Sequence, residues 1–84
     1  MTLEEYVKKY PPSMVTKELI RKLQQFSKDD DYILGVLAES PYDVDRQLII
    51  DYIEYGEDVD YCNVILFSME VGLKREQMEA ENKE

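Results

Sequence analysis

The sequence predicts an all-α protein, a compact bundle of four to five short helices. Three observations lead to this prediction: apolar residues recur at helical spacing, capping residues precede these segments, and prolines or a glycine follow several of them. The 84 residues suffice for one domain with a small core. We expect the helical domain to occupy residues 1–73. A polar tail, residues 74–84, should fray as a helix because it has few apolar anchors.

Five segments carry helix signals. A capping box, Thr2 with Glu5, precedes the first segment, and two consecutive prolines end it. Aspartates stand before the later segments, where a carboxylate can accept the free backbone N–H groups of a first turn. The first predicted helix covers residues 3–10, and the second is capped by Ser13 or Thr16 and reaches about Ser27. The others cover residues 32–39, 44–55 (capped by Asp43) and 61–73 (capped by Asp58 or Asp60).

The fourth of these helices is unusually apolar. Val44, Leu48 and Tyr55 belong to an apolar arc that exceeds half of its circumference, and Gly56 is placed to follow it as the C′ residue. A helix of this kind needs neighbours on two sides.

Residues 61–71 admit a second interpretation. Their β-branched and aromatic side chains also suit a buried strand, and periodicity alone does not assign a short apolar run. We favour the helix because the sequence has no second strand candidate to pair with it. An α+β fold with residues 61–71 as a strand is the minor alternative.

Charge is spread very unevenly along the chain. Residues 1–28 hold six basic and three acidic side chains, a net charge of +3. Residues 29–73 hold twelve acidic side chains and one basic side chain, Arg46, a net charge of −11. Such an acidic stretch repels DNA and anionic membranes and attracts basic partners.

The sequence offers little material for catalysis. It contains no histidine, the commonest general acid–base group, and its three glycines are far apart rather than in a phosphate-binding loop. We therefore predict no catalytic residue, no cofactor and a protein that is not an enzyme.

Metal binding is not expected either. One cysteine without histidine cannot build a zinc site, and we expect Cys62 to be a small buried side chain of the last helix. The carboxylates at 29–31 and at 57–60 could hold a divalent cation loosely. Helix capping and solvated loop charges explain both runs better.

Nucleic-acid binding is the alternative function that the basic N-terminal third suggests. The first two helices could form a helix–turn–helix, with Lys17, Arg21, Lys22 and Lys28 on phosphates. We prefer an intramolecular interpretation, in which a basic helix packs beside acidic ones. A total charge of −9 opposes binding that depends on phosphate contacts.

The acidic stretch is also rich in tyrosine, a residue enriched in protein interfaces. We predict that tyrosines and carboxylates there form a surface that binds a basic protein partner. The residues assigned to this surface are Tyr42, Asp43, Asp45, Asp51, Glu54, Tyr55, Glu57, Asp58 and Asp60.

Three versions of this idea stay open. The chain neutralises a basic protein, as antitoxins and immunity proteins do, or it mimics DNA with carboxylates in place of phosphates. In the third version it is a homodimer through the last two helices, and its acidity only maintains solubility. The lone cysteine, the short apolar runs and the absence of signal-peptide features lead us to expect a cytoplasmic protein that does not enter membranes.

Overall fold

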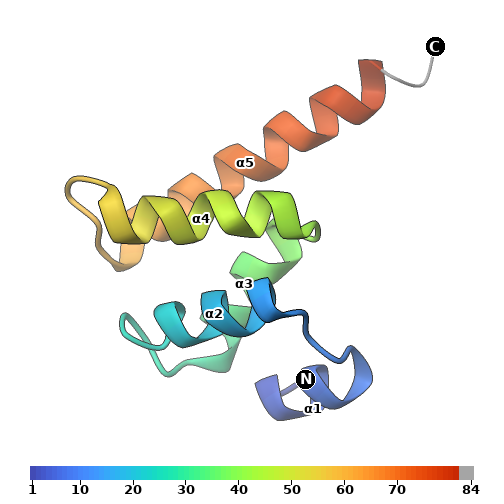
Figure 1. Ribbon diagram of the computed structural model, residues 1–84, viewed down its shortest axis with the longest axis vertical. Coiled ribbons are helices and arrows are strands. Elements are labelled where there is room, and N and C mark those ends of the chain that lie inside the picture. Colours follow the sequence, from blue (N-terminus) through green and yellow to red (C-terminus); the bar gives the residue numbers. More distant parts are fainter. Residues whose placement is uncertain (82–84) are drawn as a thin grey trace.

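The computed structural model describes residues 1–81, which form five helices and no strand (Figure 1). The all-α prediction is confirmed. The alternative strand at residues 61–71 is not found, because those residues lie within the last helix. The helices are α1 (Leu3–Lys9), α2 (Met14–Leu23), α3 (Asp30–Glu39), α4 (Asp43–Tyr55) and α5 (Tyr61–Glu81).

Four helices begin at side-chain caps. Thr2, Ser13, Asp29 and Asp60 each accept a backbone hydrogen bond from the first turn of the helix that follows, at 3.2, 3.1, 3.0 and 2.8 Å. Of the two predicted caps of the last helix, Asp60 is therefore the one that the structure confirms. The fourth helix differs from the prediction, because Asp43 is its first residue and the N-cap, Tyr42, makes no side-chain capping bond. The carboxylate of Asp43 is directed to another helix instead, as described below.

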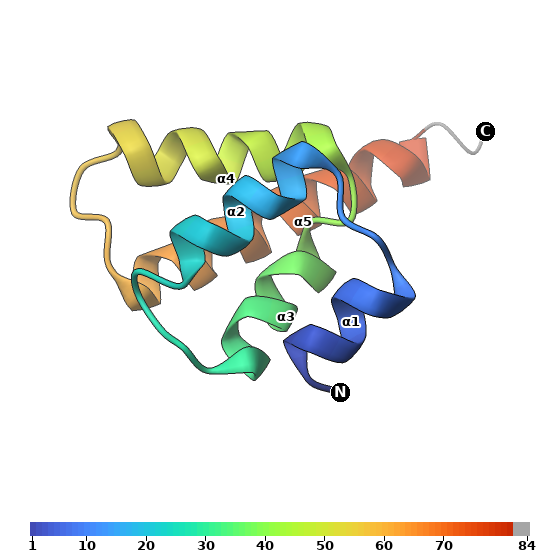
Figure 2. The ribbon, with the colours of Figure 1, turned by 60° about the horizontal axis from the view of Figure 1, so that its bottom comes forward.

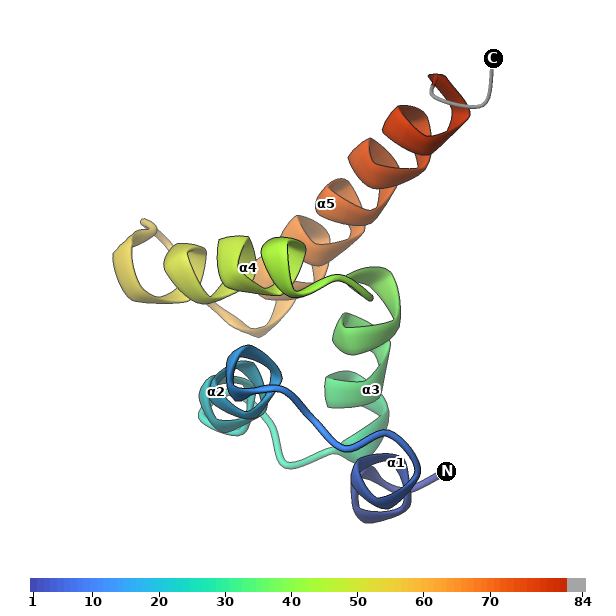
Figure 3. The same cartoon turned by 45° about the vertical axis from the view of Figure 1, so that its right-hand side comes forward.

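The helices enclose one core. α2 packs against α4, α3 packs against α5, and α1 lies on α3 (Figures 2 and 3). α2 supplies Leu19 and Leu23, four residues apart on one side of the helix, and both are fully buried. α4 therefore has α2 on one side and α5 on the other. The buried core consists of Leu19, Leu23, Tyr32, Ile33, Val36, Leu37, Ile49, Ile50 and Val64.

The apolar arc of α4 is only partly covered by its two neighbours. Ile49 and Ile50 are buried, but Val44, Leu48 and Tyr55 are 61%, 49% and 81% exposed. Figure 1 shows why the N-terminal part of the arc is open: α5 crosses α4 and then diverges from it, rather than running alongside it. The expected neighbours on two sides are present, α2 and α5, but they leave part of the arc uncovered.

Cys62 is exposed, so the prediction of a buried thiol is also wrong. It precedes the buried Val64 by two residues in the first turns of α5. Two residues turn a helix by about 200°, so these two side chains lie on nearly opposite sides of it.

The last helix continues from Tyr61 to Glu81 without a break at Leu73. Its C-terminal half projects beyond the other helices (Figure 1). Fraying of this end stays a prediction, and residues 82–84 of the predicted tail lie outside the described residues. None of the helices in residues 1–81 combines the length and apolar character needed to cross a membrane.

Candidate functional site

The nine residues of the predicted surface lie in three places. Tyr42, Asp43 and Asp45 stand at the N-terminal end of α4, Asp51 and Glu54 lie on its later turns, and the other four lie at or after its C-terminal end. The ends of a helix of 13 residues are about 18 Å apart at 1.5 Å per residue. The nine residues therefore do not form one patch.

The end of α4 and the loop that follows it present four of these residues to solvent. Tyr55 is 81% exposed, and Glu57 and Asp58 are exposed and take part in no ion pair within residues 1–81. Asn63 stabilises the loop: its N–H donates to Asp60 Oδ1 at 2.8 Å, and its Nδ2 donates to the Asp58 carbonyl oxygen at 2.7 Å. Tyrosine and carboxylates are thus displayed on a loop held by hydrogen bonds.

A glycine at the C′ position usually has a left-handed backbone, but the glycine of this loop does not. Gly56 is extended, with φ of −74°, and its small size serves a close approach, because a Cβ there would collide with the backbone oxygen of Tyr52. The left-handed residue is Asp58, with φ of 55°. Aspartate enters this region more readily than most residues, because its short side chain bonds locally.

A tyrosine pair joins the loop to the N-terminal end of α3. The rings of Tyr32 and Tyr61 stack with centroids 4.2 Å apart, and the Tyr32 hydroxyl donates to the Tyr61 carbonyl oxygen at 3.2 Å. Burial raises the pKa of Tyr32 to about 12. The pair places the aspartates at 29–31 at the same end of the molecule as the loop, a proximity that sequence reasoning missed.

These carboxylates do not assemble into a metal site. Within the described residues, no group of three or more acidic or cysteine side chains is arranged to hold a metal ion. Two of the aspartates at 29–31 have structural roles. Asp29 caps α3, and Asp30 Oδ2 accepts a hydrogen bond from the Leu3 N–H at 3.0 Å.

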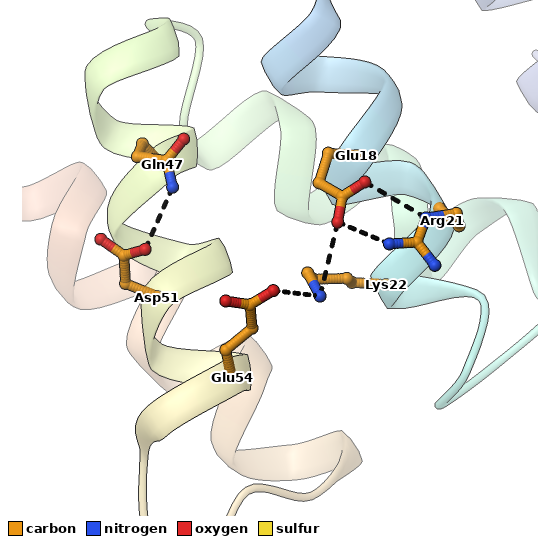
Figure 4. Close-up of polar contacts among 6 residues, drawn as sticks. All are labelled: Glu18, Arg21, Lys22, Gln47, Asp51 and Glu54. Atoms are coloured by element: carbon orange, nitrogen blue, oxygen red, sulfur yellow. Dashed lines mark hydrogen bonds and ion pairs between the residues drawn. The ribbon is translucent and has the colours of Figure 1, made fainter.

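Glu54 is engaged within the fold (Figure 4). Its carboxylate lies 2.6 Å from Lys22 Nζ of α2, and the carboxylate of Glu18 lies 3.4 Å from the same nitrogen. The hydrogen bond to Glu54 raises the pKa of Lys22, and the hydrogen bond from Arg21 lowers the pKa of Glu18. Glu54 therefore holds α2 against α4. Asp51 nearby is exposed and accepts a hydrogen bond from Gln47 at 3.0 Å.

Asp45 is only 4% exposed, so the structure removes it from the predicted surface. Its two carboxylate oxygens accept hydrogen bonds from Arg75 at 3.0 and 3.1 Å. The guanidinium of Arg75 also lies 5.0 Å from the ring centroid of Tyr42, whose hydroxyl donates to Glu79 at 2.8 Å. Hydrogen bonding to Asp45 raises the pKa of Arg75, and the bond to Glu79 raises the pKa of Tyr42.

These contacts fasten the projecting half of α5 to the start of α4. Sequence reasoning missed Arg75 and Glu79 because both lie in the segment interpreted as a polar tail. The spacing of four residues between them, which places them on one side of a helix, was the available signal.

Asp43 ends a chain of hydrogen bonds between α2 and α4. Ser13 Oγ lies 3.0 Å from Asp43 Oδ1 and 3.1 Å from Thr16 Oγ1. A carboxylate only accepts, so the Ser13 hydroxyl donates to Asp43 and the Thr16 hydroxyl donates to Ser13. Arg46 in turn donates to Thr16 Oγ1 at 2.6 Å. A buried cation is thereby connected to an exposed carboxylate.

No family model, curated protein or solved structure matches this chain. Its fold and charge define it as a small acidic all-α protein.

Proposed function

We propose that this chain is a non-catalytic interaction module that binds a basic segment of a partner protein. The binding surface is the acidic loop, defined as Tyr55, Glu57, Asp58 and Asp60. One observation carries the proposal: the most exposed tyrosine of the nine-residue set stands beside carboxylates that have no ion-pair partner within residues 1–81.

Two features support this choice among the acidic residues. Asp45 and Glu54 already neutralise Arg75 and Lys22, so recruiting them would break contacts between helices. The carboxylates of Glu57 and Asp58 form no ion pair within residues 1–81, so binding a partner breaks no such contact. Because the bonds of Asn63 hold its shape, less conformational entropy is lost on binding.

A cytoplasmic location is part of the proposal. The chain has a single cysteine, and its thiol is exposed, which fits a reducing compartment. The total charge of −9 supports fast association with basic partners through long-range attraction.

The test is an affinity capture from host lysate with two variants of equal charge. The loop variant is Glu57→Lys/Asp58→Asn, because asparagine also tolerates the left-handed conformation of Asp58, and the matched control is Glu5→Lys/Glu76→Gln, which changes two exposed carboxylates elsewhere by the same charge. We expect the wild type and the control to retain a basic protein that the loop variant loses. Equal retention by both variants would refute the acidic loop as the binding surface.

Salt dependence gives a second readout. Binding should weaken when salt is raised from about 0.05 to about 0.5 M, because exposed charges are screened within a few ångströms at the higher value. Nucleic-acid-binding proteins among those captured would favour mimicry of DNA over neutralisation of another basic protein.

Nucleic-acid binding by the basic helices is less well supported. Lys22 is buried against Glu54, and Arg21 donates two hydrogen bonds to Glu18, so two of the four expected phosphate contacts are engaged within the fold. α1 packs on α3, whereas a helix–turn–helix would pair it with α2. If duplex DNA retains the wild type at low salt but not Lys17→Glu/Arg21→Glu, nucleic-acid binding would be better supported than binding of a basic protein.

Self-association is the second candidate, and one observation favours it. Leu66, Met69 and Leu73 are 61%, 46% and 58% exposed, and their spacing places them along one side of α5. Two copies would bring like charges together, so a dimer should strengthen as salt rises, opposite to binding of a basic partner. Sedimentation at low and high salt distinguishes the two.

A further inference from the structure

An apolar groove lies between α4 and α5, apart from the acidic loop. Its volume is about 360 Å³. Val44 and Leu48 line it from α4, and Phe67, Val71 and Met78 line it from α5. The groove exists because α5 diverges from α4 towards its C-terminal end (Figures 1 and 3).

The wall formed by α4 continues to the acidic loop. Val44, Leu48 and Tyr55 are separated by four and seven residues, so they follow one side of the helix. Asp51 lies on the same side, three residues after Leu48. A ligand seated on Leu48 thus meets, towards the C-terminal end of α4, an acidic residue that forms no ion pair within residues 1–81.

The size of the groove suits side chains from a helix. A buried cavity of about 150 Å³ accepts a benzene molecule, so about 360 Å³ holds about two large apolar side chains. Amphipathic helices insert apolar residues into such grooves at spacings of three, four and seven. Met78 at the rim is flexible enough to fit different partners.

The distribution of charge around the groove favours a basic ligand. The charged residues of the groove already pair with each other: Asp45 with Arg75 at 3.0 Å and Glu70 with Lys74 at 3.6 Å. The middle of the groove is therefore close to neutral, while Asp51 and the acidic loop make one end negative. A second copy would bring another net charge of −9 to this end, whereas a basic helix would be attracted.

We propose that the groove binds a basic amphipathic helix of a partner protein. Its apolar side chains lie on Leu48 and Phe67, and its basic residues lie over Asp51 and the acidic loop. This inference rests on the proposed function, because it specifies the shape of the basic segment that the acidic loop attracts.

The experiment uses the full chain and two synthetic peptides as probes. One is a labelled peptide of about 18 residues in which leucine and lysine form an amphipathic helix, and the other has the same composition in scrambled order. Binding is measured by fluorescence anisotropy in about 0.15 M salt. We expect the amphipathic peptide to bind at least about tenfold more tightly than the scrambled one.

The groove variant is Val44→Ser/Leu48→Gln, which changes two exposed residues without changing the charge. It should weaken binding of the amphipathic peptide by about tenfold. The matched control is Leu66→Gln/Leu73→Gln, which removes exposed leucines outside the groove and should bind like the wild type. Circular dichroism of each variant confirms that the helices are intact.

The outcomes separate the two proposals. Loss of binding in the loop variant, but not in the groove variant, overturns the groove and leaves the acidic loop as the surface. Loss in the groove variant alone supports the groove and refutes the loop. Equal binding of both peptides, or equal loss in the leucine control, overturns the groove. A wild-type dimer that the groove variant abolishes also overturns this proposal, because it assigns the groove to a second copy.

Discussion

The guanidinium of Arg46 in α4 donates a hydrogen bond of 2.6 Å to the hydroxyl of Thr16 in α2, and both side chains are buried. The same guanidinium donates to the carbonyl oxygens of Ser40 at 2.6 Å and Leu37 at 3.1 Å, at the C-terminal end of α3. No ion pair within residues 1–81 includes it. A fourth acceptor is the Tyr6 hydroxyl at 3.4 Å. The charge of Arg46 is therefore stabilised by four hydrogen-bond acceptors and by the negative end of the α3 dipole.

Replacing Arg46 should therefore destabilise the whole fold. Arg46→Ala leaves the Thr16 hydroxyl and two helix-end carbonyl oxygens without their donor, and we expect a loss of about 3 kcal/mol in the free energy of unfolding. Arg46→Lys should recover only part of it, because an ammonium group cannot reproduce the planar fork of a guanidinium. Urea denaturation followed by circular dichroism measures both values.

The matched control for this prediction is Lys17→Ala on the exposed side of α2. It should change the free energy of unfolding by less than about 0.5 kcal/mol. If Arg46→Ala is no more destabilising than this control, the buried hydrogen-bond network does not stabilise the fold.

Most of the fold could be predicted because helix ends are local events. Thr2, Ser13 and Asp29 cap helices near their expected positions, since a cap needs only the residues of one turn. The burial of α4 was not predictable in this way. Val44 and Ile50 are both apolar, and which of them is covered depends on how α5 crosses α4, which no local pattern contains.

For the candidate site, the exposure of charged loop residues could be predicted, but the ion pairs between helices could not. Glu57 and Asp58 are exposed, as charged residues between two helices suggest. Asp45 and Glu54 were not recognised as ion-pair partners, because their cations come from other helices. Arg75 lies 30 residues beyond Asp45, and only the packed helices bring the two together.

The C-terminal half of α5 should depend on Arg75. Arg75→Ala removes the two bonds to Asp45 and the contact with the Tyr42 ring, so the backbone amides of residues 74–81 should lose protection by about tenfold or more in hydrogen exchange. Amides of residues 64–72 should keep their protection because α3 and α4 still cover them.

Two further variants show which contacts protect the end of α5. Lys74→Ala breaks only an exposed pair with Glu70 and should leave the exchange of residues 74–81 nearly unchanged. Tyr42→Phe keeps the aromatic ring but loses the hydrogen bond to Glu79, so its effect should be intermediate. Unchanged protection in Arg75→Ala would mean that α5 holds its end without these contacts.

Two glycines should respond to alanine in opposite directions. A Cβ at Gly35, in the middle of α3, meets no atom within 4 Å, so Gly35→Ala should stabilise the protein by about 0.5–1 kcal/mol. A Cβ at Gly72 would stand 2.8 Å from the backbone oxygen of Glu39, where α5 passes the end of α3. Gly72→Ala should therefore destabilise by about 1–3 kcal/mol through overpacking. Urea denaturation of both variants tests this, and stabilisation by Gly72→Ala would contradict the close approach of the two helices.

Tyr32 should make the fold sensitive to alkaline pH. Burial raises its pKa from 10.0 to about 12 in the folded chain, so the fold favours the protonated phenol. Between these pH values the unfolded chain binds fewer protons at this site than the folded chain, and the free energy of unfolding falls as pH rises. The contribution of Tyr32 is complete below pH 10.0 and is lost towards pH about 12.

Thermal unfolding across this range should show a steeper decline in stability for the wild type than for Tyr32→Phe, which cannot ionise. Tyr42 also has a raised pKa, so the two proteins are compared: the late-titrating phenolate absorbance should be smaller by one tyrosine in Tyr32→Phe than in the wild type. Equal pH dependence of the two proteins would mean that Tyr32 ionises as readily in the fold as in the unfolded chain.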